Sequence, residues 1–328
     1  MKVGVFSCKP YDKAMLESAN SDGHLSYTFI EEPLTPLTAI ACHDFDAVCI
    51  FVNDKVCGET VRALADAGVS HIALRCAGYN NVDVDEAKKL GLRVSRVPAY
   101  SPHTVAEHAL ALILTLNRKT HKAYNRVKEG NFDIQGLQGF TLHGKTVGIV
   151  GTGRIGQAVA RILSGFGCTL LCYDPMPAQS VKALGASYTD LQTLLSTSHI
   201  ITLHCPLNEG SYHLINEETI AQMRDGVMLI NTSRGGLVNT QAVIKGLKSK
   251  KIGYLGLDVY EMESELFFRD HSLEIIQDDE FERLASFHNV LITGHQGFFT
   301  QEAMQEIAAV TVANIRMPGE NNDNFLAP

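Results

Sequence analysis

The sequence predicts an α/β fold of two doubly wound units, each a parallel sheet with helices on both faces. Short apolar runs alternate with segments that carry apolar residues at helical spacing. A glycine run at 151–156 directly follows one apolar run, and a proline-containing break at 98–102 separates an earlier series of runs from a later one. The 328 residues are enough for two domains that each bury a core.

In the first unit, we expect helices at 11–18, 59–67 and 83–90 and strands at 2–6, 25–30, 47–51, 71–75 and 93–97. Residues 104–117 are apolar nearly all round, which predicts a buried helix at a domain or subunit interface and favours a homo-oligomer.

In the second unit, we expect helices at 157–166, 190–195, 217–223 and 240–248 and strands at 145–150, 168–173, 200–204, 227–231, 254–259 and 290–293. A last helix is expected at 301–315, followed by a polar tail at 318–328.

The glycine run has the surroundings that a dinucleotide needs. Gly151, Gly153 and Gly156 stand between an apolar run and a helical segment, so backbone amides at a helix N-terminus are placed to meet a pyrophosphate. Asp174 ends the next apolar run, where a carboxylate accepts hydrogen bonds from the adenosine ribose. Its charge would repel a 2′-phosphate, and no arginine follows it, so the sequence favours NAD over NADP.

Residues 139–146 also match the phosphate-loop pattern GxxxxGK[ST]. That loop works only between a strand and a helix, whereas Lys145 opens a strand, so we reject an ATPase. The net charge of −8 argues against nucleic acid, and the longest apolar stretch, 109–116, is too short for a membrane span. Eight cysteines without paired spacing, and no signal peptide after Met1, predict a reducing cytoplasm and no metal site.

Polar residues follow the expected strands of the second unit, where ligands of open α/β sheets bind. Arg234 follows the run at 227–231, Asp258 and Glu263 follow the next, and His295 follows the last. An imidazolium donates a proton to a developing alkoxide, a carboxylate favours the charged imidazole, and arginine binds a carboxylate. Together they predict a carbonyl/alcohol redox reaction, although each residue alone is more often a surface or capping residue.

With these residues in place, the chain resembles the D-isomer-specific 2-hydroxyacid dehydrogenases, and among them the bacterial fermentative D-lactate dehydrogenases. The likeness runs in one register from the first strand to about residue 307. It includes the glycine run and the segments LRCAGYNNVD (74–83), VPAYSP (97–102), VAEH (105–108), HCPL (204–207), NTSRG (231–235), LDVYE (257–261) and GHQ (294–296).

The resemblance implies a Rossmann NAD-binding domain at 101–298, inserted into a flavodoxin-like substrate domain at 1–100 and 299–328. It implies that Arg234 binds the substrate, His295 is the acid/base and Glu263 supports His295. Substrate contacts map to Ala77, Gly78 and Tyr100. Besides the three glycines, cofactor contacts map to Arg154, Ile155, Asp174, Cys205, Pro206, Thr232 and Asp258. Ser211 stands where relatives often have an Asn near the adenosine side of the cofactor, so the resemblance does not decide whether residue 211 contacts the cofactor.

The sequence therefore predicts NADH-dependent reduction of pyruvate to D-lactate, and the reverse, in a cleft that closes over a small-molecule substrate. One alternative is a dehydrogenase for a larger, branched or aromatic 2-keto acid. Another is an NAD-sensing interaction protein, which need not turn over substrate.

Overall fold

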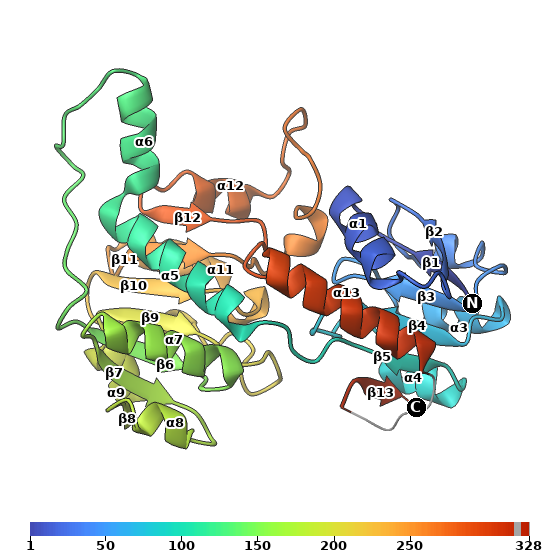
Figure 1. Ribbon diagram of the computed structural model, residues 1–328. Helices are drawn as coiled ribbons and strands as arrows, with labels where there is room; N and C mark the ends of the chain where they lie inside the picture. The colour runs from blue at the N-terminus through green and yellow to red at the C-terminus, as the bar shows by residue number, and fades with distance from the viewer. Residues whose placement is uncertain (318–322, 328) are drawn as a thin grey trace. The chain divides into compact units, whose positions relative to one another are not determined.

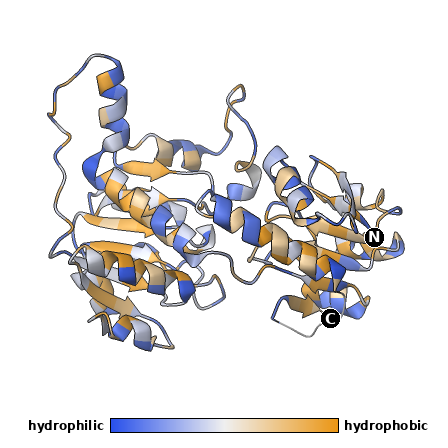
Figure 2. Cartoon of the chain, in the orientation of Figure 1, coloured by the Kyte–Doolittle hydropathy of each residue, from blue (hydrophilic) through white to orange (hydrophobic). Residues whose placement is uncertain are grey.

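The computed structural model describes residues 1–317 and 323–327 (Figure 1). The chain forms two compact units, which are Met1–Ser101 with Phe299–Pro328 (unit 1) and Pro102–Phe298 (unit 2). Figure 2 shows that the strands of both units are mostly hydrophobic, as strands covered on both faces require. No helix within the described ranges is long and apolar enough to cross a membrane.

The sheet of unit 1 has the order β13-β5-β4-β3-β1-β2. Five parallel strands follow the flavodoxin-like order 2-1-3-4-5: β1 (Lys2–Val5), β2 (Ser26–Phe29), β3 (Ala47–Ile50), β4 (His71–Leu74) and β5 (Arg93–Ser95).

The prediction of a polar tail at 318–328 is wrong for its last described residues, which form a strand. Part of that segment, 318–322 and 328, lies outside the described residues. Phe325–Ala327 form β13, which pairs antiparallel with β5. The ring of Phe325 stacks on His71 at 5.9 Å and Ala327 is fully buried, so apolar burial holds this strand in place.

The last helix returns to the first strands. Ala308, Val312 and Ile315 of α13 (Gln301–Arg316) share an apolar core with Val3 and Val5 of β1. Helix α13 also packs against α1 (Pro10–Ala19). The other helices of unit 1 are α2 (Pro36–Ala39), α3 (Gly58–Asp66) and α4 (Val84–Lys89).

The sheet of unit 2 has the order β12-β11-β10-β9-β6-β7-β8, and its pairs are parallel. Numbered from β6, this is the Rossmann order 3-2-1-4-5-6 with one further strand. The strands are β6 (Thr146–Val150), β7 (Thr169–Tyr173), β8 (Ser187–Tyr188), β9 (Ile200–Leu203), β10 (Val227–Asn231), β11 (Ile252–Leu257) and β12 (Val290–Ile292).

Alternate strand residues of unit 2 enter two separate cores. Ile200 and Met228 join the core beneath α5 (Pro102–Arg118) and α7 (Arg154–Gly165), whereas Ile201 and Leu229 join the core on the other face. The remaining helices are α6 (Thr120–Lys128), α8 (Gln179–Lys182), α9 (Leu191–Thr197), α10 (Glu217–Gln222), α11 (Thr240–Lys248), α12 (Asp279–Ala285) and the 3-10 turns η1 (Gly235–Leu237) and η2 (Glu263–Glu265).

The buried face of α5 is accounted for within unit 2. Its residues Ala106, Ala109 and Ile113 are fully buried in the core that α5 shares with α7. An interface is therefore not needed to explain the apolar character of this helix.

Candidate active site

The turn between β6 and α7 needs its glycines. Gly151 has a φ of 93°, and a Cβ there would lie 2.6 Å from the backbone nitrogen of Cys205. A Cβ on Gly156 would lie 2.0 Å from the carbonyl oxygen of Gly151. A Cβ on Gly153, the N-cap of α7, would instead enter open space. That space lies at the positive end of a helix of 12 residues, where a pyrophosphate binds favourably.

A cavity of about 480 Å³ opens beside this turn. Five residues expected to contact a dinucleotide line it, namely Gly151, Gly153, Asp174, Cys205 and Pro206. Of the other expected contacts, Arg154 and Ile155 begin α7, Gly156 is buried in its first turn, Thr232 follows β10 and Asp258 follows β11. The sequence did not single out Tyr173, Met176, Asn208 or Leu214, which complete much of the lining.

Asp174 is fixed at this cavity by backbone amides. Its Oδ2 accepts a hydrogen bond from Thr152 N at 2.6 Å, and its Oδ1 accepts one from Met176 N at 2.8 Å. Both bonds orient the carboxylate that the sequence assigned to the adenosine ribose.

Two further groups fit a bound dinucleotide. The Oγ1 of Thr232 is buried without a hydrogen-bond partner among the described residues, as is typical where a ligand completes a site. Burial raises the pKa of the Cys205 thiol to about 11, so the cavity carries a neutral thiol there. With the open glycine turn and the oriented Asp174, these residues fit NAD.

His295 lies just beyond β12 and is hydrogen-bonded to Glu263. Its Nδ1 lies 2.9 Å from Glu263 Oε1, and the two side chains are 15% and 23% exposed. Glu263 Oε2 accepts a hydrogen bond from Tyr260 N at 3.0 Å, which fixes the carboxylate. His295 adopts a left-handed φ of 52°, a strained conformation that clusters at functional sites.

Asp258 anchors the backbone at His295 and at the two residues after it. Its carboxylate accepts hydrogen bonds from Gln296 N at 2.9 Å and Gly297 N at 2.8 Å, and its backbone oxygen accepts one from His295 N at 2.7 Å. Burial opposes ionisation of Asp258, but hydrogen bonds from His108 and Thr293 outweigh it and hold its pKa below the usual range. The carboxylate is therefore an anionic anchor, a role that the sequence did not indicate.

Arg234 lies in the loop after β10, between Asn231 and Gly235. Asn231 Nδ2 donates to Arg234 O at 2.8 Å, and the Arg234 Nη1 donates to Ser233 O at 2.7 Å. A Cβ on Gly235 would lie 2.1 Å from Tyr260 O, so this loop packs directly against the segment that leads to Glu263. Within the described chain, Arg234 forms no hydrogen bond or ion pair with Glu263 or His295.

The sequence and structure were compared with known proteins. The model of the family described as D-isomer specific 2-hydroxyacid dehydrogenase, NAD binding domain, matches residues 110–297. The chain belongs to this family.

Its relatives match along nearly the whole chain. A D-lactate dehydrogenase of Curvularia clavata is 54% identical over 96% of this chain and 91% of its own. The apo-structure of D-lactate dehydrogenase from Escherichia coli, 49% identical, covers 100% of both chains with a TM-score of 0.91. A D-lactate dehydrogenase from Aquifex aeolicus, complexed with NAD and lactic acid, is 34% identical and covers 96% of this chain and 94% of that one, with a TM-score of 0.85. This protein is thus an NAD-dependent oxidoreductase that acts on a small-molecule acid.

Aromatic rings flank the histidine of this dehydrogenase. The ring centroid of Phe268 lies 5.7 Å from that of His295, and the ring of Phe298 meets it edge-on at 6.4 Å. Phe268, like His295, has a left-handed φ, here 66°. These rings exclude water from part of the imidazole surface.

The expected substrate contacts outside unit 2 lie on loops of unit 1. Ala77 and Gly78 follow β4, where Ala77 O accepts a hydrogen bond from Arg96 and Gly78 O accepts one from Cys76 Sγ. Tyr100 follows β5. Their contacts with substrate stay predictions. Ser211 lines the cofactor cavity, and its hydroxyl donates to Pro206 O at 2.7 Å.

Proposed function

We propose that this dehydrogenase reduces pyruvate to D-lactate with NADH, reversibly, with His295 as the acid/base. The observation that carries the proposal is the His295–Glu263 hydrogen bond beyond the carboxyl ends of the unit 2 strands. Close similarity to D-lactate dehydrogenases over nearly the full chain favours pyruvate. The match of the cofactor-domain model within unit 2 favours unit 2 as the NAD-binding domain and unit 1 as the substrate domain.

The hydrogen bonds determine which imidazole nitrogen handles the proton. Because Nδ1 faces an acceptor-only carboxylate at 2.9 Å, Nδ1 carries a hydrogen and Nε2 holds the transferable proton. The negative charge of Glu263 stabilises the imidazolium before the proton leaves. When bound, NADH supplies the hydride.

Arg234 is proposed to bind the carboxylate of the substrate. Its planar fork suits a bidentate contact, and the tight packing of Gly235 against Tyr260 holds its loop in place. Holding the substrate by its carboxylate directs the keto oxygen toward His295, leaves the keto carbon to take the hydride, and so selects 2-keto acids.

The proposal is tested by a stereospecific assay. The enzyme is mixed with NADH and pyruvate, NADH oxidation is followed, and the lactate is separated on a chiral column. We expect D-lactate alone, and a higher kcat/KM for pyruvate than for 2-ketoisocaproate or phenylpyruvate. L-lactate would contradict the stereochemistry, and preference for a larger acid would reassign the substrate.

We also propose a homo-oligomer in a reducing cytoplasm. Phe132 and Ile134, beyond α6, are 75% and 80% exposed, which favours coverage by another chain. All eight cysteines are free, as in a reducing compartment. Light scattering of the purified protein tests the first point, and a mass of one chain would contradict it.

A further inference from the structure

A second large cavity of unit 2 lies at the opposite end of the sheet from His295. It has a volume of about 730 Å³, within the roughly 300–1,000 Å³ range of ligand sites. Its lining includes Gly226 before β10, Ile252 at the start of β11 and Asn289 before β12. Strand β11, with 6 residues at about 3.3 Å each, therefore separates it by roughly 20 Å from the catalytic end.

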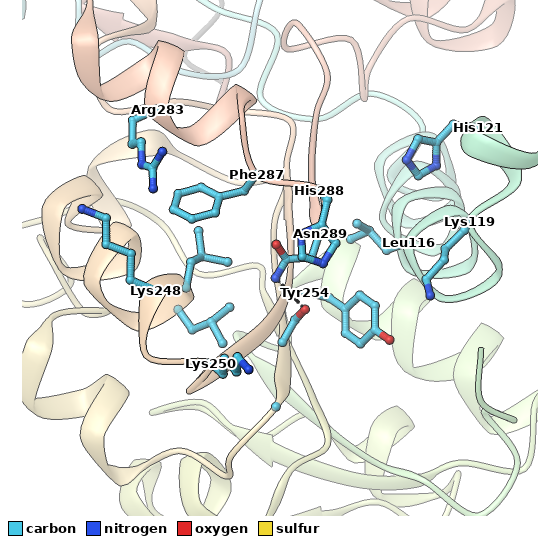
Figure 3. A pocket seen from close by; sticks show the side chains of 14 residues that line it. Leu116, Lys119, His121, Lys248, Lys250, Tyr254, Arg283, Phe287, His288 and Asn289 are labelled. Atoms are coloured by element: carbon cyan, nitrogen blue, oxygen red, sulfur yellow. Dashed lines mark hydrogen bonds between the residues drawn. The ribbon is translucent and has the colours of Figure 1, made fainter. Parts of the chain in front are cut away.

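Among the described residues, the side chains that line this cavity carry positive charge only. Lys119, Lys248, Lys250 and Arg283 line it together with two histidines, and no Asp or Glu is among the described lining residues. Figure 3 shows Lys248, Lys250 and Arg283 on one side of Tyr254 and Lys119 on the other. These cations gather at one cavity although the net charge of the chain is −8.

None of these four cations has an anionic partner among the residues that the structure describes, and Lys119 Nζ donates to two backbone carbonyl oxygens. Within the described residues, Lys248, Lys250 and Arg283 form no ion pair, although Lys245 on the same helix pairs with Glu217 at 2.5 Å and the neighbouring Lys251 pairs with Asp225 at 2.9 Å. Arg283 stacks on the ring of Phe287 at 4.6 Å, which holds the guanidinium beside the cavity.

The field around the cavity is also positive. Burial lowers the pKa of His121 in its lining, and the charge of nearby Lys122 lowers it further. The pKa of Lys122 is itself lowered by burial and then by Lys119 and Arg126. Repulsion among these cations is relieved when an anion binds between them.

We propose that this cavity is a second binding site, which takes a small anion with two or more negative charges. Apolar side chains in its lining, including Leu247 and Ile252, lower the local dielectric and strengthen the attraction of an anion to the cations. Phosphate and carboxylate groups share this chemistry, so the probes must separate them.

Calorimetry tests the site with pyrophosphate and, separately, citrate as the probes. Saturating NADH is present throughout to keep pyrophosphate from the glycine turn, and chloride keeps ionic strength constant. We expect saturable binding by the wild type and at least about tenfold weaker binding by the double variant Lys248→Gln/Lys250→Asn. Asn suits position 250 because its φ is 64°. Binding of only one probe identifies the group that the site takes.

Lys245→Gln is the control, since it removes one positive charge from α11, the helix that carries Lys248, at a position outside the cavity. It should bind like the wild type, and the double variant should keep wild-type turnover of NADH and pyruvate, which reports intact folding. Absence of saturable binding, or equal weakening in Lys245→Gln, overturns the proposal. The proposal is also overturned if the double variant binds the anions like the wild type but forms an assembly of different mass in solution. The cations would then contact a second copy of the chain.

Discussion

His295 is held from three directions. Glu263 binds its Nδ1, Asp258 binds its backbone nitrogen, and the rings of Phe268 and Phe298 lie beside the imidazole. The backbone conformation at His295 costs on the order of 1–3 kcal/mol, which these contacts must offset. The same contacts fix the position of the imidazole that we propose as the acid/base.

Replacing His295 by Gln should leave NADH binding unchanged and lower kcat by about 10²–10⁴-fold, because the proton donor is removed. Fluorescence titration of NADH and steady-state kinetics measure the two effects. His213→Gln is a matched control, since His213 also pairs with a glutamate, Glu261, at 2.5 Å. Near-normal turnover of the His295 variant would reject the assignment.

Replacing Glu263 by Gln should lower kcat by roughly tenfold or more, because an amide no longer holds Nδ1–H of His295 as the carboxylate does at 2.9 Å. Steady-state kinetics measure kcat, and a fluorescence titration should show unchanged NADH binding. The control Glu261→Gln should keep the wild-type kcat, and an unchanged kcat in Glu263→Gln would remove Glu263 from this role.

For single residues, the sequence predicts the candidate catalytic side chains better than it predicts the hydrogen bonds that hold them in place. Arg234, Glu263 and His295 follow strands of one parallel sheet, so the strand-end rule singles them out. The amides of Gln296 and Gly297 donate hydrogen bonds to the Asp258 carboxylate, and these bonds depend on the left-handed backbone at His295. No residue type in the sequence indicates that conformation.

At the scale of the elements, two glycines of the turn at the start of α7 are required for different reasons. Gly156 is required by packing, because the carbonyl oxygen of Gly151 occupies the place of a Cβ. Gly153 is free of protein atoms in that direction, so only a ligand requires it.

Alanine substitutions should therefore separate stability from binding. Gly153→Ala should keep the melting temperature but weaken NADH binding by roughly tenfold or more, whereas Gly156→Ala should lower both. Gly165→Ala, at the far end of α7 in open space, should change neither by much. Thermal melts and NADH titrations measure these effects. Loss of stability without loss of binding in Gly153→Ala would contradict the proposed place of the pyrophosphate.

The sequence predicted the fold class and most long elements, since their apolar periodicity is strong. It missed α6, in which only Ala123, Tyr124 and Val127 are apolar and no residue is buried, so its periodic signal is short. It also missed β13, because three residues become a strand only through pairing with β5.

For the molecule as a whole, buried histidines couple stability to pH. Burial and, to a smaller extent, the charge of Arg93 lower the pKa of His71 to about 3, so the folded protein keeps this histidine neutral. An unfolded histidine takes up a proton near pH 6.5. The stability that His71 contributes is therefore present above pH 6.5 and is lost progressively as pH falls toward 3.

We expect the free energy of unfolding to fall more steeply with acid in the wild type than in His71→Gln, by up to about 1.4 kcal/mol per pH unit below pH 6.5. Urea titrations at pH 7, 6 and 5 measure it. His204, whose burial lowers its pKa to about 4, should keep part of the slope. The variant His24→Gln, which changes an exposed histidine, should keep the full slope of the unfolding free energy against pH. Equal slopes in the wild type and in His71→Gln would refute the coupling.

The position of α13 and β13 has a consequence for synthesis on the ribosome. All of unit 2 leaves the exit tunnel before residues 299–327, yet α13 and β13 pack into the sheet that the first residues began. The nascent amino-terminal strands must therefore wait, with their apolar faces incompletely covered, while the inserted unit folds. We therefore expect the yield of this protein to depend on translation speed near the carboxyl terminus and on chaperone supply more than it would for a protein whose domains follow each other in order.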